Sequence, residues 1–73
     1  MEILAKQLLE LRKSRGLTRQ AVADAIQIAA RTYQRYENSE REPTASVLVA
    51  LADFYEVSID YLVGRTNNRE MNR

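Results

Sequence analysis

The chain has 73 residues, of which 45% are hydrophobic and 29% are charged, and its net charge is +1. This composition is typical of one folded domain rather than of a disordered chain. Cysteine and histidine are both absent, which removes disulfides, thiol nucleophiles, imidazole bases and the commonest zinc ligands. The composition therefore disfavours an enzyme, and we expect neither a metal ion nor a cofactor.

The start of the chain and its longest apolar run both argue against a membrane protein. Glu2 and Lys6 interrupt any signal-like segment. The apolar run at residues 47–52 falls far short of the ~18 residues that a membrane-spanning helix needs. We therefore expect a cytoplasmic protein that has no membrane partner.

Apolar side chains recur at helical spacing along the chain and predict five helices and no strand, an all-α compact bundle. The first helix runs from about residue 3 to residue 14 and ends before Gly16. A second helix follows Thr18, a favourable N-cap, and a turn at residues 27–29 leads into a third. The side chains of the first two helices that we expect in the core are Leu4, Leu8, Leu11, Val22, Ala23 and Ile26.

The second half of the chain carries its own start and stop signals. Pro43 closes the loop after the third helix, and Thr44 caps a fourth. Ser58 caps a short fifth helix, which Gly64 ends. We divide the chain into a helical domain, residues 1–64, and a polar tail, residues 65–73, which we expect to be flexible.

The third helix separates into two faces at about 100° per residue. Tyr33 and Tyr36 lie on one face, where their rings supply apolar area to the core. The opposite face, which we call the outer arc, consists of Ala30, Arg31, Gln34, Arg35 and Asn38. It is cationic and contains no acidic residue that would repel a phosphate.

An α-helix fits the major groove of DNA, and the outer arc carries the side chains that read bases there. Arginine binds guanine, glutamine binds adenine, and an alanine methyl contacts the methyl group of thymine. We therefore predict that Arg31 and Gln34 read bases and that Ala30 makes the methyl contact. Arg35 lies one turn further along and reaches a base or a phosphate. In the first turn of the second helix, the backbone N–H groups near Arg19 and Gln20 favour a phosphate.

Charge is distributed unevenly along the chain, in a way that suits a phosphate backbone on one side. Basic residues outnumber acidic ones over residues 12–42, whereas residues 53–60 carry acidic side chains and no basic one. A charge run taken alone usually means only solvated surface. The charge distribution therefore favours phosphate binding at the outer arc but does not identify a site by itself.

Dispersed positions over residues 5–64 resemble the phage repressor/Cro (XRE-like) family of helix-turn-helix regulators. The motif residues that carry the resemblance are Leu17 to Ala23, Ile26, Ile28, Tyr33, Arg35 to Glu37 and Arg41 to Pro43; further positions are Leu48, Leu51 to Asp53, Val57, Ser58 and Asp60 to Gly64. The resemblance implies a five-helix DNA-binding domain and a regulator, most often a repressor.

The resemblance also implies roles for single residues. Ala30, Arg31 and Arg35 match positions that commonly read bases, and Gln34 matches a more variable contact. Arg19, Thr32 and Arg41 match positions that touch the DNA backbone. With Gln20 and the outer-arc residue Asn38, the predicted phosphate contacts are Arg19, Gln20, Thr32, Asn38 and Arg41. Arg12 and Glu37 match positions that form a structural ion pair between the first and third helices.

Three residues depart from the family pattern around the third helix. Gln27 stands where a turn glycine is usual, so it either adopts a left-handed backbone, at a cost of roughly 1 kcal/mol, or reshapes the turn. Ala29 replaces the usual Ser or Thr cap, which leaves helix N–H groups to water or a DNA phosphate. Ser39 replaces a frequent glycine. These changes bear on the angle between the two helices.

The fourth helix lacks the polar face of an ordinary surface helix, since Ser46 and Asp53 are the only polar residues over positions 45–55. We place Leu48, Leu51, Ala52 and Tyr55 in the core. The remaining apolar residues either pack under neighbouring helices or form a twofold homodimer. The predicted dimer residues are Val49, Phe54, Val57, Ile59 and Tyr61. In such a dimer, the third helices of the two chains lie ~34 Å apart, about one turn of DNA, which predicts a palindromic DNA site.

Three functions remain open from the sequence. The first is a regulator that binds double-stranded DNA as a homodimer. The second is an antitoxin-like or other protein-interaction module with a protein partner, in which DNA binding is secondary. The third, an enzyme, is disfavoured because no nucleophile or base accompanies the carboxylates Glu37, Glu40 and Glu42.

Overall fold

The computed structural model describes residues 2–69. Five α-helices form over this part of the chain: α1 (Glu2–Ser14), α2 (Arg19–Ala25), α3 (Ala30–Glu37), α4 (Ala45–Tyr55) and α5 (Ile59–Leu62). The described residues contain no strand, so the prediction of an all-α domain of five helices is confirmed.

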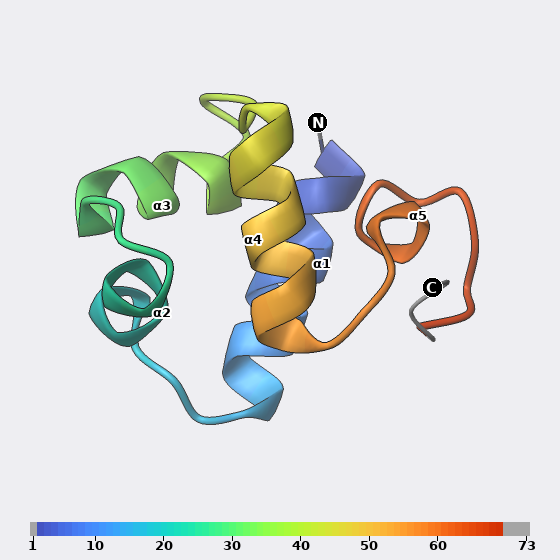
Figure 1. Ribbon diagram of the computed structural model, residues 1–73, viewed down its shortest axis with the longest axis horizontal. Helices are drawn as coiled ribbons and strands as arrows, with labels where there is room; N and C mark the ends of the chain where they lie inside the picture. The colour runs from blue at the N-terminus through green and yellow to red at the C-terminus, as the bar shows by residue number, and fades with distance from the viewer. Residues whose placement is uncertain (1, 70–73) are drawn as a thin grey trace.

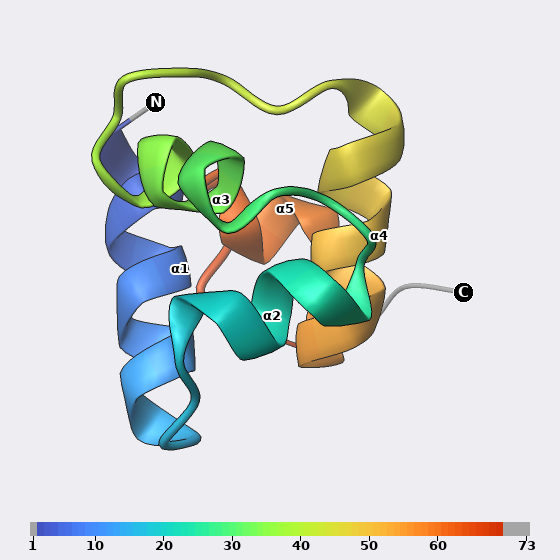
Figure 2. The same ribbon diagram turned by 90° about the vertical axis from the view of Figure 1, so that its left-hand side faces the viewer.

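The helices are arranged so that α2 and α3 lie together at one side of the molecule. In Figure 1 this pair lies to the left of α1 and α4, and α5 lies at the opposite side. Figure 2 views the molecule from the α2–α3 side, where α3 packs above α2 and both lie between α1 and α4. The α2–α3 pair therefore forms one side of the domain.

Three helices begin with the side-chain caps that the sequence predicted. The hydroxyl oxygens of Thr18, Thr44 and Ser58 accept hydrogen bonds from the backbone N–H three residues further on, at 3.0, 3.3 and 2.9 Å. Each cap satisfies one of the N–H groups that a helix start leaves without a partner. Gly16, with a φ of 64°, supplies the left-handed residue after α1.

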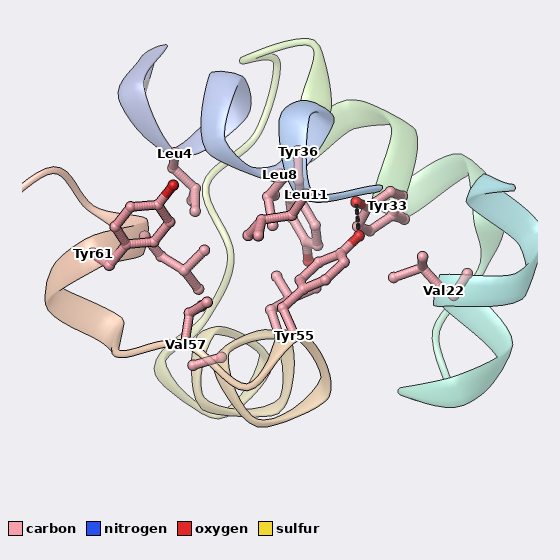
Figure 3. Close-up of a cluster of buried hydrophobic side chains, with 13 residues drawn as sticks. Leu4, Leu8, Leu11, Val22, Tyr33, Tyr36, Tyr55, Val57 and Tyr61 are labelled. Atoms are coloured by element: carbon pink, nitrogen blue, oxygen red, sulfur yellow. Dashed lines mark hydrogen bonds between the residues drawn. The ribbon is translucent and has the colours of Figure 1, made fainter. Parts of the chain in front are cut away.

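The core lies where all five helices meet, and Figure 3 shows its side chains pointing toward one another. Leucines of α1 pack there against tyrosines of α3, α4 and α5. Leu48 and Ile26, both expected inside, are half-buried and pack against its edge. The buried cluster consists of Leu4, Leu8, Leu11, Val22, Ala23, Tyr33, Tyr36, Leu51, Ala52, Tyr55, Val57, Tyr61 and Leu62.

Two buried phenols join α3 to α4. The hydroxyl oxygens of Tyr33 and Tyr55 lie 2.8 Å apart, drawn as the dashed line in Figure 3, and neither residue has any exposed surface. Burial, chiefly, raises the pKa of both phenols well above the ordinary value. Both side chains are therefore neutral at physiological pH, and each hydroxyl has its partner inside the core.

The described part of the polar tail, residues 65–69, returns to α5. The backbone N–H of Ser58 donates to the carbonyl oxygen of Arg69 at 3.0 Å, and the Arg69 guanidinium lies 5.2 Å from the centre of the Tyr61 ring. These contacts lie in the segment that composition predicts to be flexible, and its flexibility stays a prediction. Residues 70–73 of the predicted tail lie outside the described residues.

Within residues 2–69, no helix has the length and apolar content needed to cross a membrane. The same residues contain no group of three or more acidic side chains placed to hold a metal ion.

Candidate nucleic-acid interface

The inner face of α3 is fixed by Tyr33 and Tyr36, which are 0% and 4% exposed. The separation of α3 into two faces is therefore as the sequence predicted. On the outer arc, Ala30 is half-buried and packs against the core edge, whereas the rest of the arc is exposed: Arg31, Gln34, Arg35 and Asn38. The arc thus presents two arginines and two amides on one rigid helical surface.

The turn between α2 and α3 is short because one residue adopts a left-handed backbone. Gln27 has a φ of 63°, so of the two outcomes predicted for it the strained backbone occurs. Just after it, the N–H of Ile28 donates to the carbonyl oxygen of Ala23 at 2.9 Å. Ala23 is fully buried, and its small side chain allows the two helices to approach closely.

The start of α3 carries no side-chain cap. Ala29 occupies the N-cap position and makes no side-chain hydrogen bond, as its methyl side chain requires. At the other end of α3, Ser39 has a φ of 59°, the conformation for which glycine is usual. No side-chain cap therefore fixes the start of the helix, which is held by its buried face.

A buried ion pair ties the end of α3 to α1. The Arg12 Nε donates to Glu37 Oε2 at 2.7 Å, and its Nη2 donates to Oε1 at 3.2 Å. The two side chains are 12% and 1% exposed. The side-chain hydrogen bond from Arg12 to Glu37 raises the pKa of Arg12 above its ordinary value, so the guanidinium keeps its positive charge. The Arg12 Nη1 also donates to the carbonyl oxygen of Leu17 at 2.9 Å, which fixes the chain before α2.

A second arginine joins this pair, which sequence reasoning missed. The Arg19 Nε donates to Glu37 Oε1 at 3.2 Å, although its side chain remains 42% exposed. The sequence assigned Arg19 only to a phosphate. Because 18 positions separate the two residues in the chain, no local spacing pattern signals the contact.

The other predicted phosphate contacts lie around the same end of the domain. The Gln20 side-chain amide donates to Asp24 at 2.7 Å, and that of Asn38 donates to Glu40 at 3.2 Å, so each amide is held by a neighbouring carboxylate. Arg41 is exposed in the loop after α3. Arg19, Gln20 and Asn38 are also exposed, whereas Thr32 is half-buried.

The predicted dimer residues fall into two groups. Val49 on α4 is 45% exposed and Ile59 on α5 is 38% exposed, while Phe54 is half-buried. The structure instead buries Val57 and Tyr61, at 2% and 7% exposure. These two belong to the core because they close the α4–α5 end against the leucines of α1, and they offer a partner little surface.

Comparison with known proteins identifies relatives over most of the chain. The model of a family described as "Helix-turn-helix" matches residues 8–62. The chain is 40% identical over 63 residues to an uncharacterized HTH-type transcriptional regulator, YobD, of Bacillus subtilis, a match that covers 86% of this chain and 56% of YobD. It is 38% identical over 63 residues to the HTH-type transcriptional regulator AnsR of the same species, covering 86% and 54%.

A third relative comes from a phage. The chain is 40% identical over 62 residues to the cryptic phage CTXphi transcriptional repressor RstR of Vibrio cholerae, covering 85% of this chain and 55% of RstR. The chain thus spans about half the length of the curated relatives it matches. No solved structure gives a significant match.

Proposed function

The chain belongs to the helix-turn-helix family, and from this premise we propose that it is a DNA-binding transcriptional regulator. The observation that carries the proposal is the exposure of the outer arc on a helix whose other face is locked into the core by Tyr33 and Tyr36. Relatives named as transcriptional regulators support it.

In this proposal α3 enters the major groove. Arg31 and Gln34 read base edges, Ala30 contacts a thymine methyl, and Arg35 reaches a base or a phosphate. Residues on α2, on α3 and after α3 position the domain on the backbone: Arg19, Gln20, Thr32, Asn38 and Arg41. These residues supply the sequence-independent part of the affinity.

We further propose that the protein acts as a homodimer and represses transcription by occupying a palindromic operator. The exposed apolar side chains of Val49 and Ile59, with the half-buried Phe54, support a twofold contact through α4 and α5. The name of the relative RstR, a transcriptional repressor, supports repression rather than activation.

Selection of duplexes from a random library, with the stoichiometry of the bound species, tests this function. We expect an enriched sequence with twofold symmetry and two protein chains per duplex. Enrichment of an asymmetric site bound by one chain would contradict the dimer. Absence of any enrichment would contradict sequence-specific binding.

A protein-interaction module is the second candidate, favoured by the same exposed valine and isoleucine. Salt distinguishes the two functions. For binding through phosphates, the logarithm of the binding constant falls linearly with the logarithm of the salt concentration. An apolar protein contact is nearly insensitive to salt. Weak, salt-insensitive interaction with every duplex would favour the module.

A further inference from the structure

The Glu37 carboxylate is shared by two arginines from different helices. Arg12 on α1 occupies Oε2 through its Nε, and Oε1 accepts from both the Arg12 Nη2 and the Arg19 Nε, each at 3.2 Å. The Glu37 side chain is 1% exposed, so its carboxylate is bound by guanidinium groups rather than by bulk water. The three side chains together carry one net positive charge.

The two arginines stand in different surroundings. Arg12 is 12% exposed and uses three of its nitrogen atoms in hydrogen bonds to Glu37 and to Leu17. Arg19 is 42% exposed, and within residues 2–69 its only hydrogen bond to another side chain is made through Nε. A guanidinium is planar and rigid, so a bond through Nε orients the whole group while leaving the terminal N–H groups available.

We propose that Glu37 is a positioning residue that holds the Arg19 guanidinium ready to bind a DNA phosphate. This inference rests on the proposed function and adds to it a cause for the affinity. A long exposed side chain loses rotamer freedom when it binds, and an arginine already held by a buried carboxylate loses less of it. Glu37 itself, being buried, touches no DNA.

The position of the three residues couples the phosphate contact to the reading helix. Arg19 is the first residue of α2, and Glu37 is the last residue of α3. The ion pair therefore sets the position of the phosphate-binding group relative to the end of the helix that carries the outer arc. A lysine at position 19 would replace it poorly, because the three donors of an ammonium group radiate from one nitrogen on a flexible stem. The planar guanidinium instead fixes its terminal N–H groups in a fork once Nε is bound to the carboxylate.

The free protein offers the first test, an NMR measurement of the exchange of arginine Nε–H protons with water. We expect the Arg19 proton to exchange at least about tenfold more slowly than those of Arg31 and Arg35, because a hydrogen bond to a buried acceptor protects it. Equal exchange rates at the three arginines would overturn the inference.

The second test is a double-mutant cycle on the affinity for a duplex of arbitrary sequence at low salt. Arg19→Gln is expected to weaken binding about fivefold in the wild-type background and less than about twofold when Glu37→Gln is also present. A purely structural role of Glu37 would leave the effect of Arg19→Gln equal in both backgrounds and would overturn the inference. Arg41→Gln is the control and should cost the same factor in both.

A third variant covers the case in which Glu37→Gln does not fold. Arg19→Lys keeps the charge on an exposed side chain, and we expect it to weaken binding about threefold more than Arg41→Lys does. Equal losses would overturn the inference. A wild-type protein that binds no duplex would overturn the proposed function itself, whereas one that binds duplexes but shows fast Arg19 exchange would overturn the positioning role alone.

Discussion

Helices α3 and α4 differ in what they leave at the surface, although both pack against the same core. α3 turns its tyrosines inward and leaves arginines and amides outside. α4 has only Ser46 and Asp53 as polar residues and leaves Val49 45% exposed. Polar side chains on a fixed helix suit directional contacts with bases, whereas exposed apolar ones suit a second protein surface. One small domain thus has two surfaces of different character.

Helix α3 is joined to its neighbours by one neutral contact and one charged contact. The Tyr33–Tyr55 hydroxyl pair links α3 directly to α4, whereas the Glu37 carboxylate links α3 to α1 and α2. The first contact depends on two phenols that keep their protons, and the second on a carboxylate shared between arginines. Different substitutions therefore remove the two contacts.

The largest effect is expected from removing the nearer of the two cations that balance Glu37. Arg12→Ala leaves a carboxylate with 1% exposure that has lost its nearest partner, and we expect the free energy of unfolding to fall by about 3 kcal/mol or more. Urea denaturation followed by circular dichroism measures it. Lys13→Ala, an exposed neighbour on α1, is the matched control and should change stability by less than about 0.5 kcal/mol. Similar losses in the two variants would contradict a special role for the pair.

The outer arc is tested by Arg31→Ala. Loss of a bidentate contact to guanine should reduce discrimination between the selected duplex and a one-base variant by about 1–3 kcal/mol without changing stability. Competition binding with both duplexes measures it. The control, Arg41→Ala, should weaken binding to all sequences alike and lower the salt slope by about 1. Unchanged discrimination in Arg31→Ala would remove that residue from the reading set.

The proposed dimer surface on α4 and α5 is tested by Val49→Glu. A charge on this exposed position should weaken the proposed dimer by about tenfold or more, because it replaces the burial of a valine by the desolvation of a carboxylate. Sedimentation equilibrium measures the dissociation constant. Ser46→Glu, on the same helix but outside the apolar surface, should leave it unchanged. A dimer equally strong in both variants would place the contact elsewhere.

The phenol pair predicts a loss of stability at high pH. The folded domain raises the pKa of Tyr33 and Tyr55 above the ordinary value of about 10. Their contribution is therefore complete below about pH 10 and decreases above it, because the unfolded chain then releases protons that the folded one retains. The free energy of unfolding should fall by about 1 kcal/mol or more between pH 10 and pH 11.

A variant without the two hydroxyls identifies the source of this pH dependence. Tyr33→Phe/Tyr55→Phe keeps the rings in the core but lacks the two hydroxyls whose pKa the fold raises, so its stability should change less over the same interval. Thermal denaturation at several pH values compares the two proteins. Curves that decline in parallel would assign the effect to other groups.

The smallest effect is expected at the turn that sets α2 against α3. Gln27→Gly relieves a left-handed backbone with a φ of 63° and should raise the free energy of unfolding by about 0.5–1 kcal/mol. Thermal denaturation detects the change, and Gln34→Gly, within helical α3, should lower stability instead. A loss of stability in Gln27→Gly would show that the turn is not strained.

Much of the fold was predictable because its signals are local. Thr18, Thr44 and Ser58 mark helix starts because their own side chains cap the backbone. Tyr33 and Tyr36 lie about one turn apart, which predicts the buried face of α3. The Arg19–Glu37 contact was not predictable, since it depends on how α2 and α3 meet. The burial of Val57 and Tyr61 was not predictable for a similar reason: an apolar side chain suits a core and a partner equally, and only tertiary packing decides between them.

The most direct test of the central claim is an NMR titration of the wild-type protein with the duplex enriched from a random library. We predict that the largest shifts occur at the outer arc of α3 and at Arg19, and that Val49 and Ile59 shift little once the dimer is formed. Large shifts confined to α4 and α5, with none on α3, would contradict the account.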